Sequence, residues 1–143
     1  MWLSERLAEY SRGLVLDVGC GEGRFLPTAG IGIDRDLGRL RAAGGRRVAA
    51  ADALRLPFAD ATFDTAYAIR MLNDTGDVDA ALSEIRRILR AGGRLLVYTR
   101  ARSAEGDRLD ASNGEARLRA HFPSVDVLPD PEHDGGALFV ASR

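Results

Sequence analysis

Short, mostly apolar runs alternate along the chain with stretches in which apolar residues recur every three or four positions. Five such runs come first, at 13–19, 30–34, 46–52, 63–69 and 94–99. Apolar runs without polar alternation are typical of strands whose two faces are both covered by helices. Two further apolar runs, "SVDVL" and "ALFVAS", flank a proline-rich stretch, and this arrangement predicts a closing hairpin.

The clearest helix is predicted over 77–93. Val78, Leu82, Ile85 and Leu89 form an apolar stripe, and Gly92 with Gly93 provides a stop signal. A short helix is expected over 36–45, with Leu37 and Leu40 on one side and a glycine pair at its end. Two more are expected, around 107–121 and in the amphipathic N-terminal segment 2–10.

Strands separated by helices predict parallel pairing through right-handed crossovers, so the chain reads as an α/β, doubly wound, mostly parallel sheet. The final hairpin makes the last strand antiparallel. One connection is unusual, because only "LPTA" lies between "GEGRF" and the next apolar run. A full helix cannot fit there, so we expect at most one turn between the first two strands.

Composition and charge remove several classes of function. A chain of 143 residues forms one domain, and a net charge of −1 gives no general attraction to nucleic acid or membrane. One cysteine and two histidines provide neither a disulfide framework nor a metal cluster. No apolar run is long enough to span a membrane, and the N-terminus lacks a secretory signal, so a cytoplasmic location is expected.

Three acids fall near the ends of the first three predicted strands. These are Asp17, Asp34 and Asp52, and the first of them precedes the glycine-rich turn "GCGEG". Ligands of open α/β sheets bind outside the carboxyl ends of the strands, so the acids and the turn are expected to share one site.

The chemistry of these acids favours an adenosine-containing cation over a dinucleotide. Carboxylates repel a pyrophosphate, and "GCGEGR" places Arg24 where the dinucleotide fingerprint has its last glycine. Asp34 can accept two hydrogen bonds from ribose hydroxyls. Asp52 can accept one from an exocyclic amine, beside the Ala53 N–H, and Asp17 suits a positive amino group or sulfonium.

Four segments together resemble the successive motifs of class I S-adenosylmethionine-dependent methyltransferases. They are "LDVGCGEGRF", "GIDRD", "ADALRLPFADATFDTAYA" and "EIRRILRAGGRLLVYT", and they span roughly residues 13–100 in the family's order. The similarity is greatest to the small-molecule branch that contains the ubiquinone and menaquinone methyltransferases. It implies a Rossmann-like seven-stranded sheet in the order 3-2-1-4-5-7-6.

The resemblance also implies the ligand and its contacts. S-adenosylmethionine would be the methyl donor and S-adenosylhomocysteine the product, with a small molecule as acceptor. By position in the motifs, the cofactor-binding residues would be Asp17, Gly19, Cys20, Gly21, Gly23, Ile33, Asp34, Arg35, Asp52, Ala53, Leu54, Ile69 and Arg70. No metal is expected.

Several residues keep a structural alternative. Asp34 can cap the helix that follows it, Asp52 can be a solvated loop acid, and Cys20 can be a small filler. The segment 56–64 is interpreted as a packing and turn device. His121 and His133 are assigned no catalytic role.

Asp74 is the candidate catalytic residue, in "RMLND", where relatives often carry a histidine pair. It can act as a general base or bind substrate, or it can cap the helix near Asp77. Tyr98 and Thr99 either face the active edge or pack in the core.

The resulting hypothesis is a methyltransferase acting on a small or medium organic acceptor. The alternative is a non-catalytic S-adenosylmethionine-binding module, because few residues are left to form a lid over the substrate. A second subunit, as in a possible homodimer, is another way to complete the site. An RNA acceptor, for which Arg70, Arg100 and Arg102 are candidate contacts, has no nucleic-acid motif in its favour.

Overall fold

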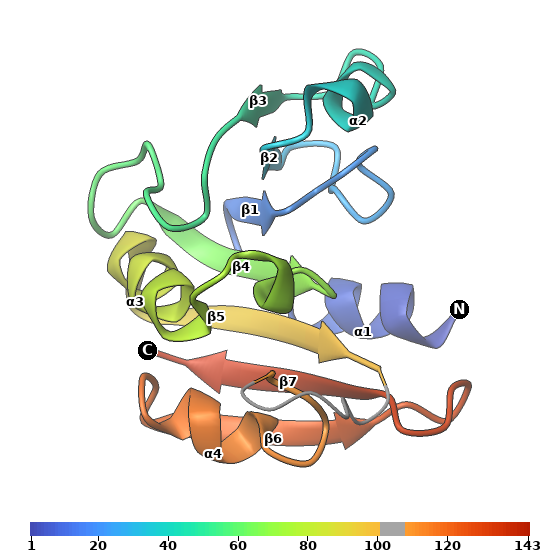
Figure 1. Ribbon diagram of the computed structural model, residues 1–143, viewed down its shortest axis with the longest axis vertical. Helices are drawn as coiled ribbons and strands as arrows, with labels where there is room; N and C mark the ends of the chain where they lie inside the picture. Colours follow the sequence, from blue (N-terminus) through green and yellow to red (C-terminus); the bar gives the residue numbers. More distant parts are fainter. Residues whose placement is uncertain (101–107) are drawn as a thin grey trace.

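A single mixed sheet organises the chain. The computed structural model describes residues 1–100 and 108–143, and within them the strand order is β3-β2-β1-β4-β5-β7-β6 (Figure 1). The predicted order is therefore confirmed. The strands are β1 (Val15–Val18), β2 (Ile31–Asp34), β3 (Val48–Ala50), β4 (Phe63–Ile69), β5 (Leu89–Thr99), β6 (Ser124–Pro129) and β7 (Ala137–Ser142).

Strand direction brings the functional segments to one edge. β1 pairs in parallel with β2 and β4, and the β2·β3 and β4·β5 pairs are also parallel. β7 runs antiparallel to both β5 and β6, as the hairpin predicts. The turn between β6 and β7 therefore lies at the same edge as the carboxyl ends of β1, β4 and β5.

Helices cover the two faces of the sheet unequally. α3 (Val78–Ile88) and α4 (Gly114–Arg119) pack on one face, where Leu82, Ile85 and Ile88 are fully buried. α1 (Trp2–Tyr10) packs on the other face through Leu7 (Figure 1). Within the described residues, no helix combines the length and apolar character needed to cross a bilayer.

The first crossover contains no helix, as predicted. Residues 20–30 pass through turns between β1 and β2, so the face that a helix would cover there is open. A cavity of about 440 Å³ lies in this position, between α1 and the crossover, and Phe25 and Tyr67 are among the residues that line it.

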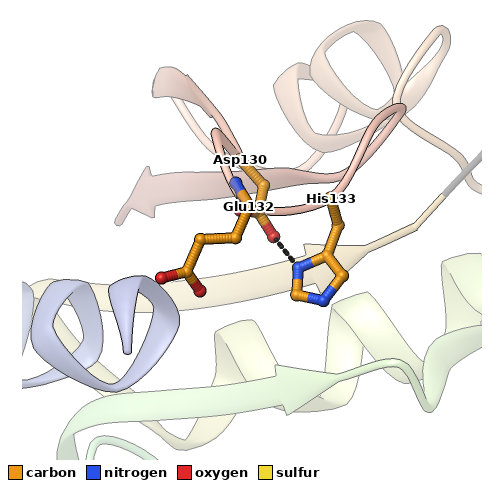
Figure 2. Close-up of side chains that lie close together, drawn as sticks. All are labelled: Asp130, Glu132 and His133. Carbon is orange, nitrogen blue, oxygen red and sulfur yellow. Dashed lines mark hydrogen bonds and ion pairs between the residues drawn. The ribbon is translucent and has the colours of Figure 1, made fainter.

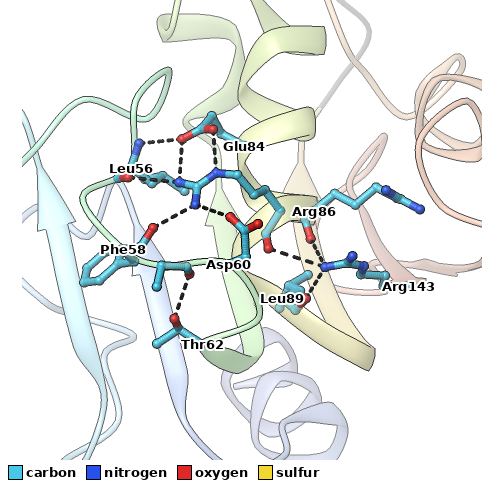
Figure 3. A network of polar contacts seen from close by, with 10 residues as sticks. Leu56, Phe58, Asp60, Thr62, Glu84, Arg86, Leu89 and Arg143 are labelled. Carbon is cyan, nitrogen blue, oxygen red and sulfur yellow. Dashed lines mark hydrogen bonds and ion pairs between the residues drawn. The ribbon is translucent and has the colours of Figure 1, made fainter.

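The predicted helix over 77–93 is too long at its C-terminal end. α3 ends at Ile88, and Leu89 is extended with φ −83° and ψ 138°. Leu89 is fully buried and pairs with Phe63 at the start of β5. Arg143 donates to the carbonyl oxygens of Arg86 and Leu89, which satisfies acceptors that a helix end leaves free (Figure 3).

Two other helices are also shorter than predicted. α2 covers only Leu37–Arg41, and Leu37 is exposed rather than packed, so Leu40 is the leucine of this helix that is buried. α4 begins at Gly114, after a turn organised by Asp110. Residue 107 of the expected helix lies outside the described residues, as does Arg102, a candidate RNA contact. β3 is likewise shorter than the expected 46–52.

Arg87 on α3 clamps the loop that joins β3 to β4. Its guanidinium donates to the Leu56 carbonyl at 3.0 Å and the Phe58 carbonyl at 2.8 Å. It also forms ion pairs with Glu84 at 2.8 Å and Asp60 at 2.9 Å, and Glu84 accepts the Leu56 N–H (Figure 3). The packing and turn interpretation of segment 56–64 is confirmed by these contacts.

A cavity of acids at the carboxyl edge

The glycine-rich turn needs glycine for its backbone shape. Gly19, Gly21 and Gly23 adopt φ values of +72°, +55° and +82°, a region that other residues rarely occupy. The N–H groups of Gly19 and Cys20 both donate to the Ile33 carbonyl, at 2.8 and 2.9 Å. A Cβ on Gly19 would also lie 2.8 Å from the Met71 Cβ. The turn is thereby fixed against the end of β2.

Asp34 connects this turn to the start of α2. Its Oδ2 accepts the Gly21 N–H at 2.9 Å, and its Oδ1 accepts the Asp36 N–H at 2.8 Å. An ionised carboxylate has about four acceptor positions, so each oxygen can still accept another hydrogen bond. The helix-cap alternative for Asp34 is wrong, because Asp36 caps α2 by accepting the Arg39 N–H.

A cavity of about 330 Å³ opens beside Asp34 at the ends of β1, β2 and β3, and we call it the Asp34 cavity. The sequence-predicted residues that line it are Gly19, Ile33, Asp34, Arg35, Asp52, Ala53 and Asp74. The lining residues that the sequence did not single out are Asp36, Arg39, Ala51, Met71 and Thr75. The motifs from three strands thus converge on one cavity.

Asp52 and Ala53 form the far wall of this cavity. The Asp52 Oδ1 accepts the Leu54 N–H at 2.9 Å, and its carbonyl accepts the Arg55 N–H, so a tight turn holds this segment. The Asp52 side chain is exposed and borders the Asp34 cavity.

Asp17 lies in β1, beneath the turn, and only 3% of its surface is exposed. Burial and the nearby charge of Asp34 raise the pKa of Asp17 from 3.8 to about 7. This acid is therefore costly to ionise until a positive charge lies near it.

Other predicted contacts lie outside the lining of the Asp34 cavity. Those residues are Asp17, Cys20, Gly21, Gly23, Leu54, Ile69 and Arg70. Cys20 is buried against Gly32, where a Cβ would come within 2.7 Å of its Sγ, as expected for a small filler. Burial and the charges of Asp17 and Asp34 raise the pKa of Cys20 to about 12, so it does not supply a nucleophilic thiolate.

Asp74 lies in a short 3₁₀ helix, η1 (Leu72–Asp74), on the β2 side of the edge. It does not cap α3, because Asp77 accepts the Ala80 N–H there at 3.0 Å. Its carbonyl accepts a hydrogen bond from Arg35 at 2.8 Å. Asp74 also lines the Asp34 cavity.

A second polar cluster lies at the end of β5, and sequence reasoning missed it. Asp130, Glu132 and His133, from the β6–β7 turn, carry ligand atoms within 4.8 Å of one another (Figure 2). Tyr98 joins them by donating to Asp130 at 2.5 Å. Asp130, Glu132 and His133 lie within four consecutive positions, but no local pattern indicates that Tyr98, 32 positions before Asp130, joins them.

Known methyltransferases resemble this chain in sequence. The chain matches the methyltransferase domain family over residues 16–97. It is 39% identical over 103 residues to a demethylmenaquinone methyltransferase of Thermobifida fusca, covering 62% of this chain and 44% of that protein. It is 35% identical over 133 residues to the O-methyltransferase resE of Aspergillus sclerotiorum, covering 81% and 48% respectively.

A solved structure extends the likeness to the whole fold. A SAM-dependent methyltransferase from Archaeoglobus fulgidus superposes with a TM-score of 0.78 at 15% identity, covering 99% of this chain and 93% of that one. The chain spans about half the length of the curated relatives it matches.

Proposed function

Because the chain belongs to the methyltransferase domain family, we propose that it transfers a methyl group from S-adenosylmethionine to a small or medium organic acceptor. The observation that carries this proposal is the Asp34 cavity, in which acids from successive strands meet a glycine-rich turn.

The hydrogen-bonding groups that line the cavity suit the adenosine part of S-adenosylmethionine. Asp34 has a free acceptor position on each oxygen for the ribose hydroxyls, and Ile33 and Arg35 flank it. We assign adenine to the wall formed by Asp52 and Ala53, with Leu54 packed behind it. Asp34 ends β2, and Asp52 and Ala53 follow β3, so ribose and adenine are assigned to neighbouring strand ends.

The methionine part is assigned to the turn. Gly19 lines the Asp34 cavity and has no side chain to obstruct a ligand, while Cys20, Gly21 and Gly23 shape the turn behind it. Asp17 lies below, as the buried counter-charge for a cation. Ile69 and Arg70, at the end of β4, would flank the reacting end.

S-adenosylmethionine supplies a methyl group on a sulfonium, and its transfer to a nucleophile leaves a neutral thioether. The residues of this chain mainly position the two reactants and exclude water, because such a displacement needs no protein nucleophile. Asp74 shares a cavity with Asp34, so we assign it to the donor side of the site rather than to the acceptor.

Transfer of a radiolabelled methyl group tests the proposal. The purified protein is incubated with methyl-labelled S-adenosylmethionine and a panel of small phenols, amines, thiols and carboxylates. We expect product with the wild type and none with Asp34→Ala. Binding of S-adenosylmethionine without transfer to any class would contradict the catalytic part of the proposal and favour a binding module.

A further inference from the structure

A separate cavity of about 250 Å³ lies on the other side of Arg70, under the first turn of α1, and we call it the Asp130 cavity. Its lining residues are Met1, Leu3, Ser4, Arg24, Phe25, Arg70, Tyr98, Arg100, Asp130, Glu132 and His133. A further hollow of about 260 Å³ lies between the two sites, since it shares Met71 with the Asp34 cavity and Arg70, Tyr98 and Arg100 with the Asp130 cavity.

The Asp130 cavity is held in shape from two sides. Glu132 accepts the Trp2 N–H at 3.2 Å, so its carboxylate caps the start of α1, toward which it points (Figure 2). The β6–β7 turn is closed by the Asp130 N–H, which donates to the Gly136 carbonyl at 2.9 Å. The helix and the turn therefore enclose a preformed space.

Asp130 is the buried centre of the cluster, with a side chain that is 2% exposed. Burial opposes its charge, but hydrogen bonds from Tyr98, the Glu132 N–H and His133 together lower the pKa of Asp130. Burial and the contact with Asp130 raise the pKa of Tyr98, so Tyr98 keeps its proton and donates it. Asp130 is thus held as a carboxylate.

This carboxylate fixes the orientation of His133. The His133 Nδ1 lies 3.0 Å from Asp130 Oδ2, and an ionised carboxylate can only accept, so Nδ1 carries a hydrogen. In the neutral ring the other nitrogen, Nε2, then carries the lone pair. Consistently, the guanidinium of Arg100 lies 3.4 Å from Nε2, the outer range of a hydrogen bond.

The Asp130 cavity carries more positive than negative side chains. Arg24, Arg70 and Arg100 line it together with the carboxylates of Asp130 and Glu132, of which Asp130 is engaged by Tyr98 and His133. Arg70 adopts φ +56°, a strained conformation for a residue with a side chain, and its N–H donates to the Tyr98 carbonyl at 2.9 Å. Such surroundings favour an acceptor that develops negative charge.

We propose that the Asp130 cavity binds a small hydroxyl-bearing methyl acceptor and that His133, oriented by Asp130, removes the proton of that hydroxyl. This inference rests on the proposed methyltransferase function and names its acceptor class. The acceptor oxygen replaces Arg100 at Nε2. As the oxygen–methyl bond forms, the carbon–sulfur bond breaks with its electron pair moving to sulfur, and the hydroxyl proton passes to His133 Nε2.

The first test measures ionisation without turnover. 4-Nitrophenol absorbs differently as a phenol and as a phenolate, so its spectrum reports the proton position when it binds to the protein saturated with S-adenosylhomocysteine. At mildly acidic pH we expect more phenolate bound to the wild type than free in solution. His133→Asn keeps a donor toward Asp130 but removes the base, and should reduce the bound phenolate about tenfold.

His121→Asn is the matched control. His121 also pairs with an aspartate, Asp79, at 2.9 Å, but it does not line the Asp130 cavity. We expect this variant to behave as the wild type. Equal bound phenolate in the His133 variant and the wild type would overturn the inference.

The second test compares two acceptors that differ in acidity, at mildly alkaline pH. His133→Asn should lower kcat for phenol by about 10²–10⁴-fold, because phenol must lose a proton. For 4-nitrophenol, already largely ionised, the loss should be less than about threefold, since no base is needed. Equal losses for both acceptors would indicate a structural role and contradict the inference.

Two further outcomes distinguish a failure of this inference from a failure of the proposed function and from a metal site. A wild type that binds S-adenosylhomocysteine but neither binds nor methylates these phenols would overturn the inference and leave the proposed function intact, whereas absent S-adenosylhomocysteine binding would refute both. Activation by added Mg²⁺ or Zn²⁺ would also overturn it, because Asp130, Glu132 and His133 would then be metal ligands.

Discussion

Asp17→Asn distinguishes the effect of the buried acid on the stability of the fold from its effect on ligand affinity. The pKa of Asp17 is raised from 3.8 to about 7, so the folded protein binds this proton more tightly than the unfolded chain does. The corresponding contribution to stability is fully present below the unfolded pKa of 3.8 and is lost as the pH rises through about 7. Its total size is roughly 4 kcal/mol.

The amide side chain introduced by Asp17→Asn carries no charge at any pH, so this loss should disappear in the variant. Between about pH 4 and 7 the wild type should lose up to about 1.4 kcal/mol of unfolding free energy per pH unit relative to Asp17→Asn. At about pH 8 the variant should be more stable by up to roughly 4 kcal/mol. Urea unfolding of both proteins at matched pH values measures this difference.

As the pH rises, the affinity for the ligand should increase while the stability of the wild type falls. A cation bound near Asp17 favours its ionised form, so the affinity of the wild type for S-adenosylmethionine should rise about tenfold per pH unit below about pH 7. Asp17→Asn should bind more weakly and without this dependence.

An exposed carboxylate, Asp126 on the edge strand β6, gives the control variant Asp126→Asn. Its stability should follow the wild type across the same pH range. Parallel stability curves for Asp17→Asn and the wild type would refute the reasoning, because they would show that Asp17 ionises at no cost in the fold.

Four further variants test the account, and two of them change residues of the Asp34 cavity. Asp34→Ala should weaken S-adenosylmethionine binding by about 3 kcal/mol, roughly a hundredfold, in calorimetry. The control is Asp77→Ala, which removes only the α3 cap. It should lower stability by about 1 kcal/mol and leave affinity unchanged. Arg87→Ala should cost about 1–3 kcal/mol in urea unfolding and speed proteolysis of the loop at 53–62, which it clamps; an unchanged digestion rate would contradict that. Asp74→Asn should change the KM for S-adenosylmethionine, and a loss of kcat alone would return Asp74 to the acceptor side.

The strands, the closing hairpin and the convergence of the acids at one edge follow from local sequence, whereas the strand order came from the resemblance to the methyltransferase family. β4 is predicted residue for residue, because its apolar run is flanked by clear turn signals. The acids ending successive strands converge because parallel strands deliver their carboxyl ends to one edge. This reasoning needs only neighbouring residues and the direction of each strand.

Features that depend on distant residues were not predictable in this way. α3 ends early because Leu89 is needed in the sheet and Arg143, at the other end of the chain, caps the free carbonyls. The cluster of Tyr98, Asp130 and His133 forms only when the β6–β7 turn folds back over β5. His133 is an ordinary turn residue in sequence; its partner Asp130 lies in the same turn, but Asp130 itself is held by the distant Tyr98.

Calorimetric titration of the wild type with S-adenosylmethionine and S-adenosylhomocysteine, with NAD as control, tests the central claim most directly. We expect both sulfur compounds to bind with micromolar affinity, Asp34→Ala to bind them roughly a hundredfold more weakly, and NAD to give no heat. Absence of binding by either sulfur compound would contradict the claim, and would show that the fold persists here without its ligand.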